Sequence, residues 1–159
     1  WGVQTEDNGI LVNGGVGAQG SGVYTDARHM ARFGWWACNY GRWEDKQLLS
    51  RRYFDYATRP HADSELPPHN PDDWYYYLPG SYGMNWWVNG MMPRKVMPEG
   101  RRMWPSLPAS SFESQGNCNN NCFVIPEWNM VFVRLGLDDI VQIFEFEPVF
   151  ALLAEALKG

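Results

Sequence analysis

The chain lacks several features that mark large classes of protein. No apolar run reaches the roughly 18 residues that a membrane span needs, so no transmembrane segment is expected. Eighteen Asp and Glu outnumber thirteen Lys and Arg, and the net charge of −5 leaves no basic surface for nucleic-acid phosphates. Three cysteines are too few for a disulfide scaffold. The chain also begins without Met and without a leader-like segment, and we expect processing or truncation to have removed its true start.

Self-sufficient catalytic motifs are lacking as well. The sequence has no G-x-S-x-G elbow, no H-E-x-x-H pair, no phosphate-binding loop and no dinucleotide fingerprint. No Ser is followed three residues later by Lys, so the serine nucleophile and lysine base of penicillin-binding enzymes are missing too. Taken alone, the chain carries no activated nucleophile that the sequence can identify.

Aromatic residues are what the chain has in excess. Nine Trp, eight Tyr and eight Phe make up 16% of it, and each such ring can bury about 150–250 Å². With 45% hydrophobic and only 19% charged residues, the 159-residue chain is expected to fold as one domain rather than to be disordered. The rings suit either a large core or a stacking surface for a ligand, and composition leaves both interpretations open.

Helix signals occur in three places. After Thr25, the expected N-cap, apolar residues recur at intervals of three and four, and Gly41 can end this helix in a left-handed cap. Ser50 is placed to cap a short helix over 51–57. Apolar residues of 146–157 repeat at helical spacing and predict an amphipathic C-terminal helix.

Strand signals are clearest in the second half of the chain. Residues 122–125 and 130–135 are predicted as strands joined by a tight turn, and 82–89 is β-prone. Residues 1–22 are rich in Gly and Asn and are expected to be irregular, and 58–81 reads as a long loop. This order of elements predicts an α+β fold in which helices flank an antiparallel sheet.

Two groups of side chains raise the question of metal or thiol chemistry. His61, Asp63 and His69 lie in the acidic loop, where their spacing is weak evidence for a metal site and a solvated loop is the alternative. Cys118 and Cys122 would lie about 13 Å apart on a strand, beyond the roughly 7 Å limit of a disulfide. We therefore expect free thiols unless a bulge or tight turn brings the pair together.

Adjacent tryptophans, Trp86 and Trp87, fall in the β-prone segment. Because neighbouring residues of a strand face opposite sides, we expect one ring to enter the core and the other to face a pocket or solvent. Exposed Trp and Tyr side chains would suit a non-catalytic binding module for carbohydrate or peptide, which stays the alternative to an enzyme.

Three stretches carry a family resemblance in combination. Residues 22–34 (GVYTDARHMARFG) with 41–50 (GRWEDKQLLS), residues 82–89 (YGMNWWVN) and residues 112–136 (FESQGNCNNNCFVIPEWNMVFVRLG) occur in this order. Together they resemble the C-terminal half of the serine β-lactamase-like hydrolases. This group holds class C β-lactamases, penicillin-binding-protein-like esterases and 6-aminohexanoate-dimer hydrolases. The resemblance implies the β-lactamase/transpeptidase-like fold, with its N-terminal part missing.

The resemblance also implies a site. Ser114, Gln115 and Gly116 fall where the family carries Lys/His-Thr-Gly. In having Ser rather than Lys or His at the first position, the chain resembles the esterases and nylon-oligomer hydrolases of the family more than its β-lactamases. The family's oxyanion hole uses the nucleophile's own N–H and the N–H after this glycine, here that of Asn117. Loss of such a donor costs about 10²–10³ in rate. The resemblance thus implies a catalytic Asn117 N–H, substrate-binding roles for these three residues and Trp86, and neither a cofactor nor a metal.

The remaining family groups lie outside the chain. The Ser-x-x-Lys pair and the Tyr of the second motif precede these segments in the family, whereas only 21 residues precede Gly22. We therefore expect the C-terminal portion of a hydrolase domain, with 1–21 as an opening segment, 22–107 as a helical and loop region, and 108–159 as strands, hairpin and C-terminal helix. The Asn-rich 117–121 departs from the smaller, Gly-containing sequence of relatives, which bears on the shape of the pocket.

The implied reaction is cleavage of a small-molecule ester or amide through an acyl-enzyme. This chain would supply one oxyanion donor and part of the pocket wall, with the aromatic segments 74–78 and 84–87 lining an apolar subsite. Open strand edges and apolar faces would require a partner, and we expect either the missing N-terminal segment or a second copy of the chain.

Overall fold

The computed structural model describes residues 10–12, 23–60, 81–91, 100–138 and 144–159. It confirms an α+β fold with antiparallel strands. None of the helices in these ranges has the length and apolar character of a membrane span. In chain order the elements are β1 (Ile10–Val12), β2 (Val23–Thr25), α1 (Ala27–Cys38), β3 (Arg42–Trp43), β4 (Lys46–Gln47), α2 (Arg51–Ala57), β5 (Trp87–Val88), β6 (Phe112–Gly116), η4 (Asn117–Asn119), β7 (Asn120–Ile125), η5 (Pro126–Trp128), β8 (Met130–Arg134) and α3 (Glu147–Ala156).

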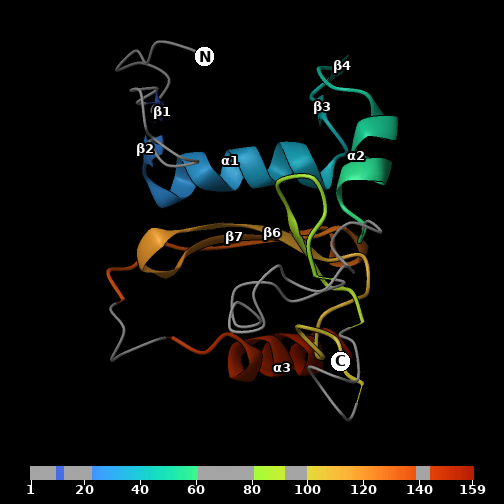
Figure 1. The fold of residues 1–159 in the computed structure, drawn as a ribbon, viewed down its shortest axis with the longest axis vertical. Helices are drawn as coiled ribbons and strands as arrows, with labels where there is room; N and C mark the ends of the chain where they lie inside the picture. Colours follow the sequence, from blue (N-terminus) through green and yellow to red (C-terminus); the bar gives the residue numbers. More distant parts are fainter. Residues whose placement is uncertain (1–9, 13–22, 61–80, 92–99, 139–143) are drawn as a thin grey trace, which may run out of the picture.

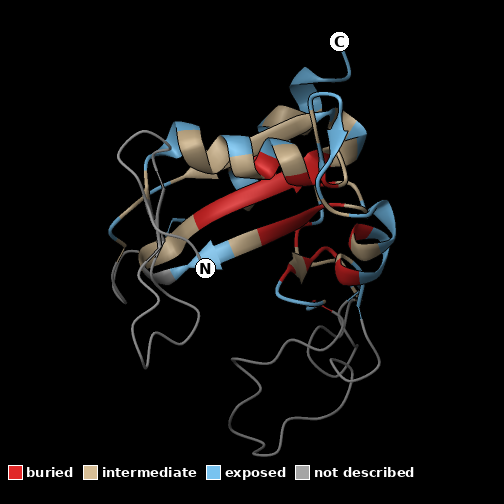
Figure 2. Ribbon diagram, turned by 90° about the horizontal axis from the view of Figure 1, so that it is seen from above, coloured by how far each residue is buried: buried red, intermediate tan, exposed pale blue. Residues whose placement is uncertain are grey.

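A four-stranded sheet forms the middle layer of the molecule. Its strands follow the order β5-β6-β7-β8, and each pair is antiparallel. Helix α1 lies across one face and α3 across the other (Figure 1). Buried residues make up much of the sheet that lies between these helices (Figure 2).

The α1 face of the sheet carries the first hydrophobic core. Phe112 of β6 lies opposite Val124 of β7, and both pack against Phe54 of α2 and Trp86. Gly34 lets α1 approach the sheet closely, because a Cβ there would lie 2.6 Å from Cys122 Sγ and from a Val131 methyl carbon.

The α3 face carries the second core. Phe150 of α3 is fully buried, with its ring centroid 4.7 Å from that of Phe123 on β7 and 5.7 Å from that of Phe132 on β8. Trp104 packs edge-on to Phe123 at 5.0 Å. The buried Asn89 amide accepts from the Trp104 N–H and donates to three carbonyl oxygens, which fixes the segment that carries Trp104. Two aromatic-rich cores therefore use most of the described rings.

The predicted helices are confirmed, with one change of cap. The first helix is capped by Asp26 rather than Thr25, since the Asp26 carboxylate accepts from the His29 N–H at 2.8 Å while Thr25 ends β2. Gly41 has the expected left-handed conformation, with φ 83°. Ser50 caps the second helix over Arg51–Ala57, as predicted.

The strand predictions need three corrections. Residues Ile10–Val12 form β1 within the segment expected to be irregular, and β3 and β4 form a short hairpin that the sequence did not suggest. The β-prone 82–89 contributes only β5 to the sheet. As expected of one ring of the tryptophan pair, Trp86 enters the first core, while Trp87 is half-buried against the second core and packs edge-on to Tyr82.

Two predictions fall outside the described residues. His61, Asp63 and His69 lie in 61–80, as does the aromatic segment 74–78. Among the residues that are described, no group of three or more His, Cys, Asp or Glu side chains is arranged to hold a metal ion.

Candidate functional site

Strand β6 runs from the core to an open edge. Phe112 and Glu113 are buried, Ser114 is half-buried, and Gln115 and Gly116 are exposed. On one side all five residues pair with β7, whereas on the other β5 pairs only with Phe112 and Glu113. Within the described part of the chain, the main chain from Ser114 onward therefore has one unpaired edge, and such an edge can bond an extended backbone or ligand.

Gly116 is not required by the conformation or the packing of this chain. Its φ of −119° is ordinary extended backbone that any residue adopts. A Cβ built on it would meet only Asn120, at 3.4 Å and 3.5 Å, which is ordinary contact. A glycine that the fold does not need is consistent with close approach of a molecule to the open edge.

A strained turn directly follows this glycine. Gly116 pairs with Asn120, and Asn117–Asn119 form the three-residue connection η4. Cys118 and Asn119 both have φ 58°, the left-handed region that costs free energy for residues other than Gly. The main chain of Asn117 thus lies where the open edge becomes the turn.

Ser114 does not have the surroundings of a nucleophile. It lies opposite Cys122 on the face that α1 covers, and its buried Oγ has no hydrogen-bond partner among the described residues. An activated serine needs a base within hydrogen-bond reach. The prediction that the nucleophile comes from elsewhere is consistent with this arrangement.

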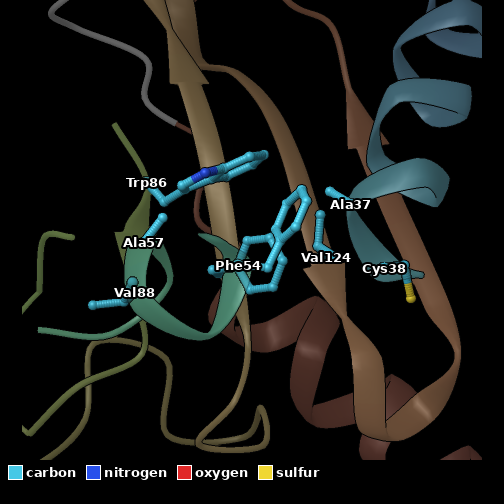
Figure 3. Close-up of a cluster of buried hydrophobic side chains, with 8 residues drawn as sticks. Ala37, Cys38, Phe54, Ala57, Trp86, Val88 and Val124 are labelled. Carbon is cyan, nitrogen blue, oxygen red and sulfur yellow. The ribbon is translucent and has the colours of Figure 1, made fainter. Parts of the chain in front are cut away.

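Trp86 lies in the first core rather than at the open edge. Its side chain is 5% exposed, and its ring packs on those of Phe33, Phe54 and Phe112. Figure 3 shows Trp86 among the buried side chains of this core, which include Phe54 and Ala57. A ring held in this way offers no face to a substrate. The predicted substrate-binding role of Trp86 is therefore replaced by a packing role.

A buried carboxyl beside the site was missed by the sequence analysis. Glu113 is 2% exposed and accepts from Asn121 Nδ2 at 2.6 Å, while Asn121 Oδ1 has no partner among the described residues. Burial raises the pKa of Glu113 to about 8, and the hydrogen bond from Asn121 opposes that rise. At neutral pH the carboxyl is mostly protonated. No local sequence pattern predicts this buried carboxyl, because Glu113 and Asn121 meet only when β6 and β7 pair in this register.

The cysteines are free thiols, as expected. Cys118 lies in the turn, and the buried Cys122 points at α1, where its thiol donates to Met30 O at 3.6 Å. Burial first, and the Glu113 carboxyl second, raise the pKa of Cys122 to about 12. This thiol is therefore not a nucleophile at physiological pH.

Comparison with known proteins gives a fold relationship. No family model matches the chain, and no curated protein matches it. Among solved structures it is similar to "Putative 6-aminohexanoate-dimer hydrolase from Bacillus anthracis", with a TM-score of 0.53 and 20% sequence identity. The similarity covers 86% of this chain and 30% of that chain, so the 159 residues span less than a third of that protein.

The similarity shows that this chain shares part of the fold of that protein. At 20% identity it shows the architecture and carries no residue role. The roles at the open edge of β6 therefore depend on the geometry of that edge.

Proposed function

We propose that this chain is part of a serine hydrolase that cleaves an ester or amide bond through an acyl-enzyme. The N–H of Asn117 is one of two oxyanion donors, and Ser114, Gln115 and Gly116 are the strand along which the substrate lies. The serine nucleophile, its lysine base and the tyrosine are supplied by another stretch of polypeptide. The main observation in support of this proposal is the open edge of β6, which ends in a glycine that the fold itself does not require.

The main-chain N–H of Asn117 would contribute to the reaction as a hydrogen-bond donor. Attack on an ester or amide carbonyl places negative charge on oxygen, and a fixed N–H aimed at that oxygen stabilises the transition state. The donor is independent of the side chain at position 117. Its position depends on the strand before it and on the turn after it.

Unpaired surfaces at the other side of the sheet support a second polypeptide stretch. Strand β8 is the last strand of the described sheet, and its five residues are all half-buried. Helix α3 carries few charges, its Leu152 is 72% exposed, and Leu157, which directly follows the helix, is 52% exposed. An open apolar strand and a helix with apolar residues on its outer side favour a strand and a helix from the nucleophile-bearing portion.

The described tryptophans do not gather into a surface that would bind carbohydrate or peptide. Trp86 and Trp104 are buried, and Trp87 packs on the second core. Of the described tryptophans only Trp35, at 41%, counts as exposed. Most of the described rings therefore form cores, and the exposed ones, Trp35, Tyr56, Tyr82 and Phe144, lie in or next to different elements.

Hydrolysis of p-nitrophenyl acetate tests the proposal. The reading frame upstream of Trp1 is first searched for Ser-x-x-Lys, and the segment that contains it is produced with this chain. The chain alone is expected to hydrolyse the ester at the background rate, and the combination is expected to show an acyl-enzyme burst. Hydrolysis by the chain alone, or an inactive combination, would contradict the proposal.

Gly116→Ala separates the site from the fold in the same assay. Because φ and packing both accept a Cβ, the free energy of unfolding is expected to change by less than about 0.5 kcal/mol. The methyl group meets the substrate, so kcat/KM is expected to fall at least about tenfold. Unchanged kcat/KM would show that no substrate approaches this strand.

A further inference from the structure

The strained turn after Gly116 is held from the segment that follows β8. The main-chain N–H of Asp138 donates to Cys118 O at 3.2 Å. Nη1 of Arg134 donates to Asn119 O at 2.9 Å. The carbonyl groups of both left-handed residues are thus fixed by one short segment of chain. Such conformations persist where the surrounding structure over-determines them, and they cluster at functional sites.

The Asp138 carboxylate joins these contacts into one unit. It accepts from Nη2 of Arg134, from Asn119 Nδ2 at 2.9 Å and from the Phe144 N–H at 2.8 Å. The Arg134 guanidinium also lies 4.7 Å from the centre of the Phe144 ring. We call the side chains of Arg134, Asp138 and Asn119, with the Phe144 N–H, the Asp138 network.

Burial and charge distinguish this network from a surface ion pair. The side chains of Arg134 and Asp138 are 21% and 11% exposed. The hydrogen bonds from Arg134, Asn119 and Phe144 lower the pKa of Asp138 to about 2, so the carboxylate is ionised at neutral pH. Arg51 and Asp55 have the same four-residue spacing but lie 3.8 Å apart with 66% and 57% exposure, and their pair holds no turn.

We propose that Asp138 is a positioning residue for the Asn117 amide, acting through Arg134 and Asn119 on the turn that follows Gly116. The inference rests on the proposed function, since the amide matters only if it is an oxyanion donor. The network lies beyond the turn, so Asp138 acts through the main chain and not on the substrate itself.

Asp138→Asn tests the network in the 159-residue chain by amide hydrogen exchange. The N–H groups of residues 138 and 144 report directly on it, and the Phe123 N–H reports on the sheet. Exchange at 138 and 144 is expected to accelerate about tenfold or more, with Phe123 unchanged. The matched control, Asp55→Asn, is expected to change none of the three. Unchanged exchange at both reporters would overturn the proposal.

Asn119→Gly is a second test of the Asp138 network, which still decides the proposal if Asp138→Asn does not fold. Gly accepts the left-handed conformation while the Nδ2 donor is lost, so the turn is kept and the network is weakened. Faster exchange at 144 with an unchanged Phe123 supports the network. Unchanged exchange at 144 overturns it.

Kinetics of the combination with the nucleophile-bearing segment test positioning rather than stability. Both variants are expected to lower kcat about tenfold, with KM unchanged and kcat referred to the burst amplitude, which counts active sites. Asp55→Asn leaves kcat unchanged. Equal kcat per active site in wild type and both variants would overturn the positioning role. If the wild-type combination is inactive, the proposed function fails, while the exchange measurement still decides whether the network holds the turn.

Discussion

The two ends of β6 differ in burial and in strand pairing. At its start, Phe112 and Glu113 are buried, with strands on both sides. At its end, Gln115 and Gly116 are exposed, and among the described residues they are paired on one side only. Within five residues the strand changes from part of the core to an open edge. The first end holds the strand in place, and the second is the end at which we propose that a substrate binds.

Phe112→Ala tests the structural end of this comparison. The ring is 1% exposed and packs edge-on to Trp86 at 5.0 Å, so its loss leaves a cavity in the first core. We expect the free energy of unfolding to fall by about 3–5 kcal/mol. Gln115→Ala, at the open end, is expected to change it by less than about 0.5 kcal/mol. Urea unfolding followed by Trp fluorescence measures both, and equal losses would show that the two ends do not differ.

Glu113→Gln tests the buried carboxyl of β6, which directly precedes the proposed substrate-binding residues. The pKa of Glu113 is raised to about 8 from 4.5, so the folded chain holds a proton that the unfolded chain releases. Stability is therefore fullest below pH 4.5 and falls as the pH rises towards 8, by at most about 1.4 kcal/mol per pH unit. Gln is neutral and removes this dependence.

The measurement is urea unfolding of wild type and variant at several pH values. Wild type is expected to lose stability relative to Glu113→Gln between pH 5 and pH 8, with a constant difference above that range. A difference that does not vary with pH would show that Glu113 is not buried as a neutral acid.

Local signals in the sequence were sufficient for the helices and for the hairpin of β7 and β8. Ser50 with its short helix, and Gly41 after α1, depend on contacts within a few residues. The cap at Asp26 was misplaced by one residue because Thr and Asp are both good caps, and only the structure shows which side chain reaches the helix. Strand β1 was missed because its partner β2 comes after a stretch rich in Gly.

The candidate site was only partly within reach of the sequence. Family resemblance drew attention to Gly116, but its open edge depends on how short β5 is. Trp86 was misassigned because a tryptophan in a core and one in a pocket have the same local pattern. The pairs Glu113–Asn121 and Asp138–Asn119 join residues from different elements, so no spacing predicts them.

The most direct measurement is made on the backbone donor itself. In the combination that hydrolyses p-nitrophenyl acetate, Asn117→Pro removes the N–H, whereas Asn117→Ala keeps it and removes the side chain. If this amide is an oxyanion donor, kcat falls about 10²–10³-fold in Asn117→Pro and stays within about threefold of wild type in Asn117→Ala. Equal kcat per active site in the two variants would contradict the account.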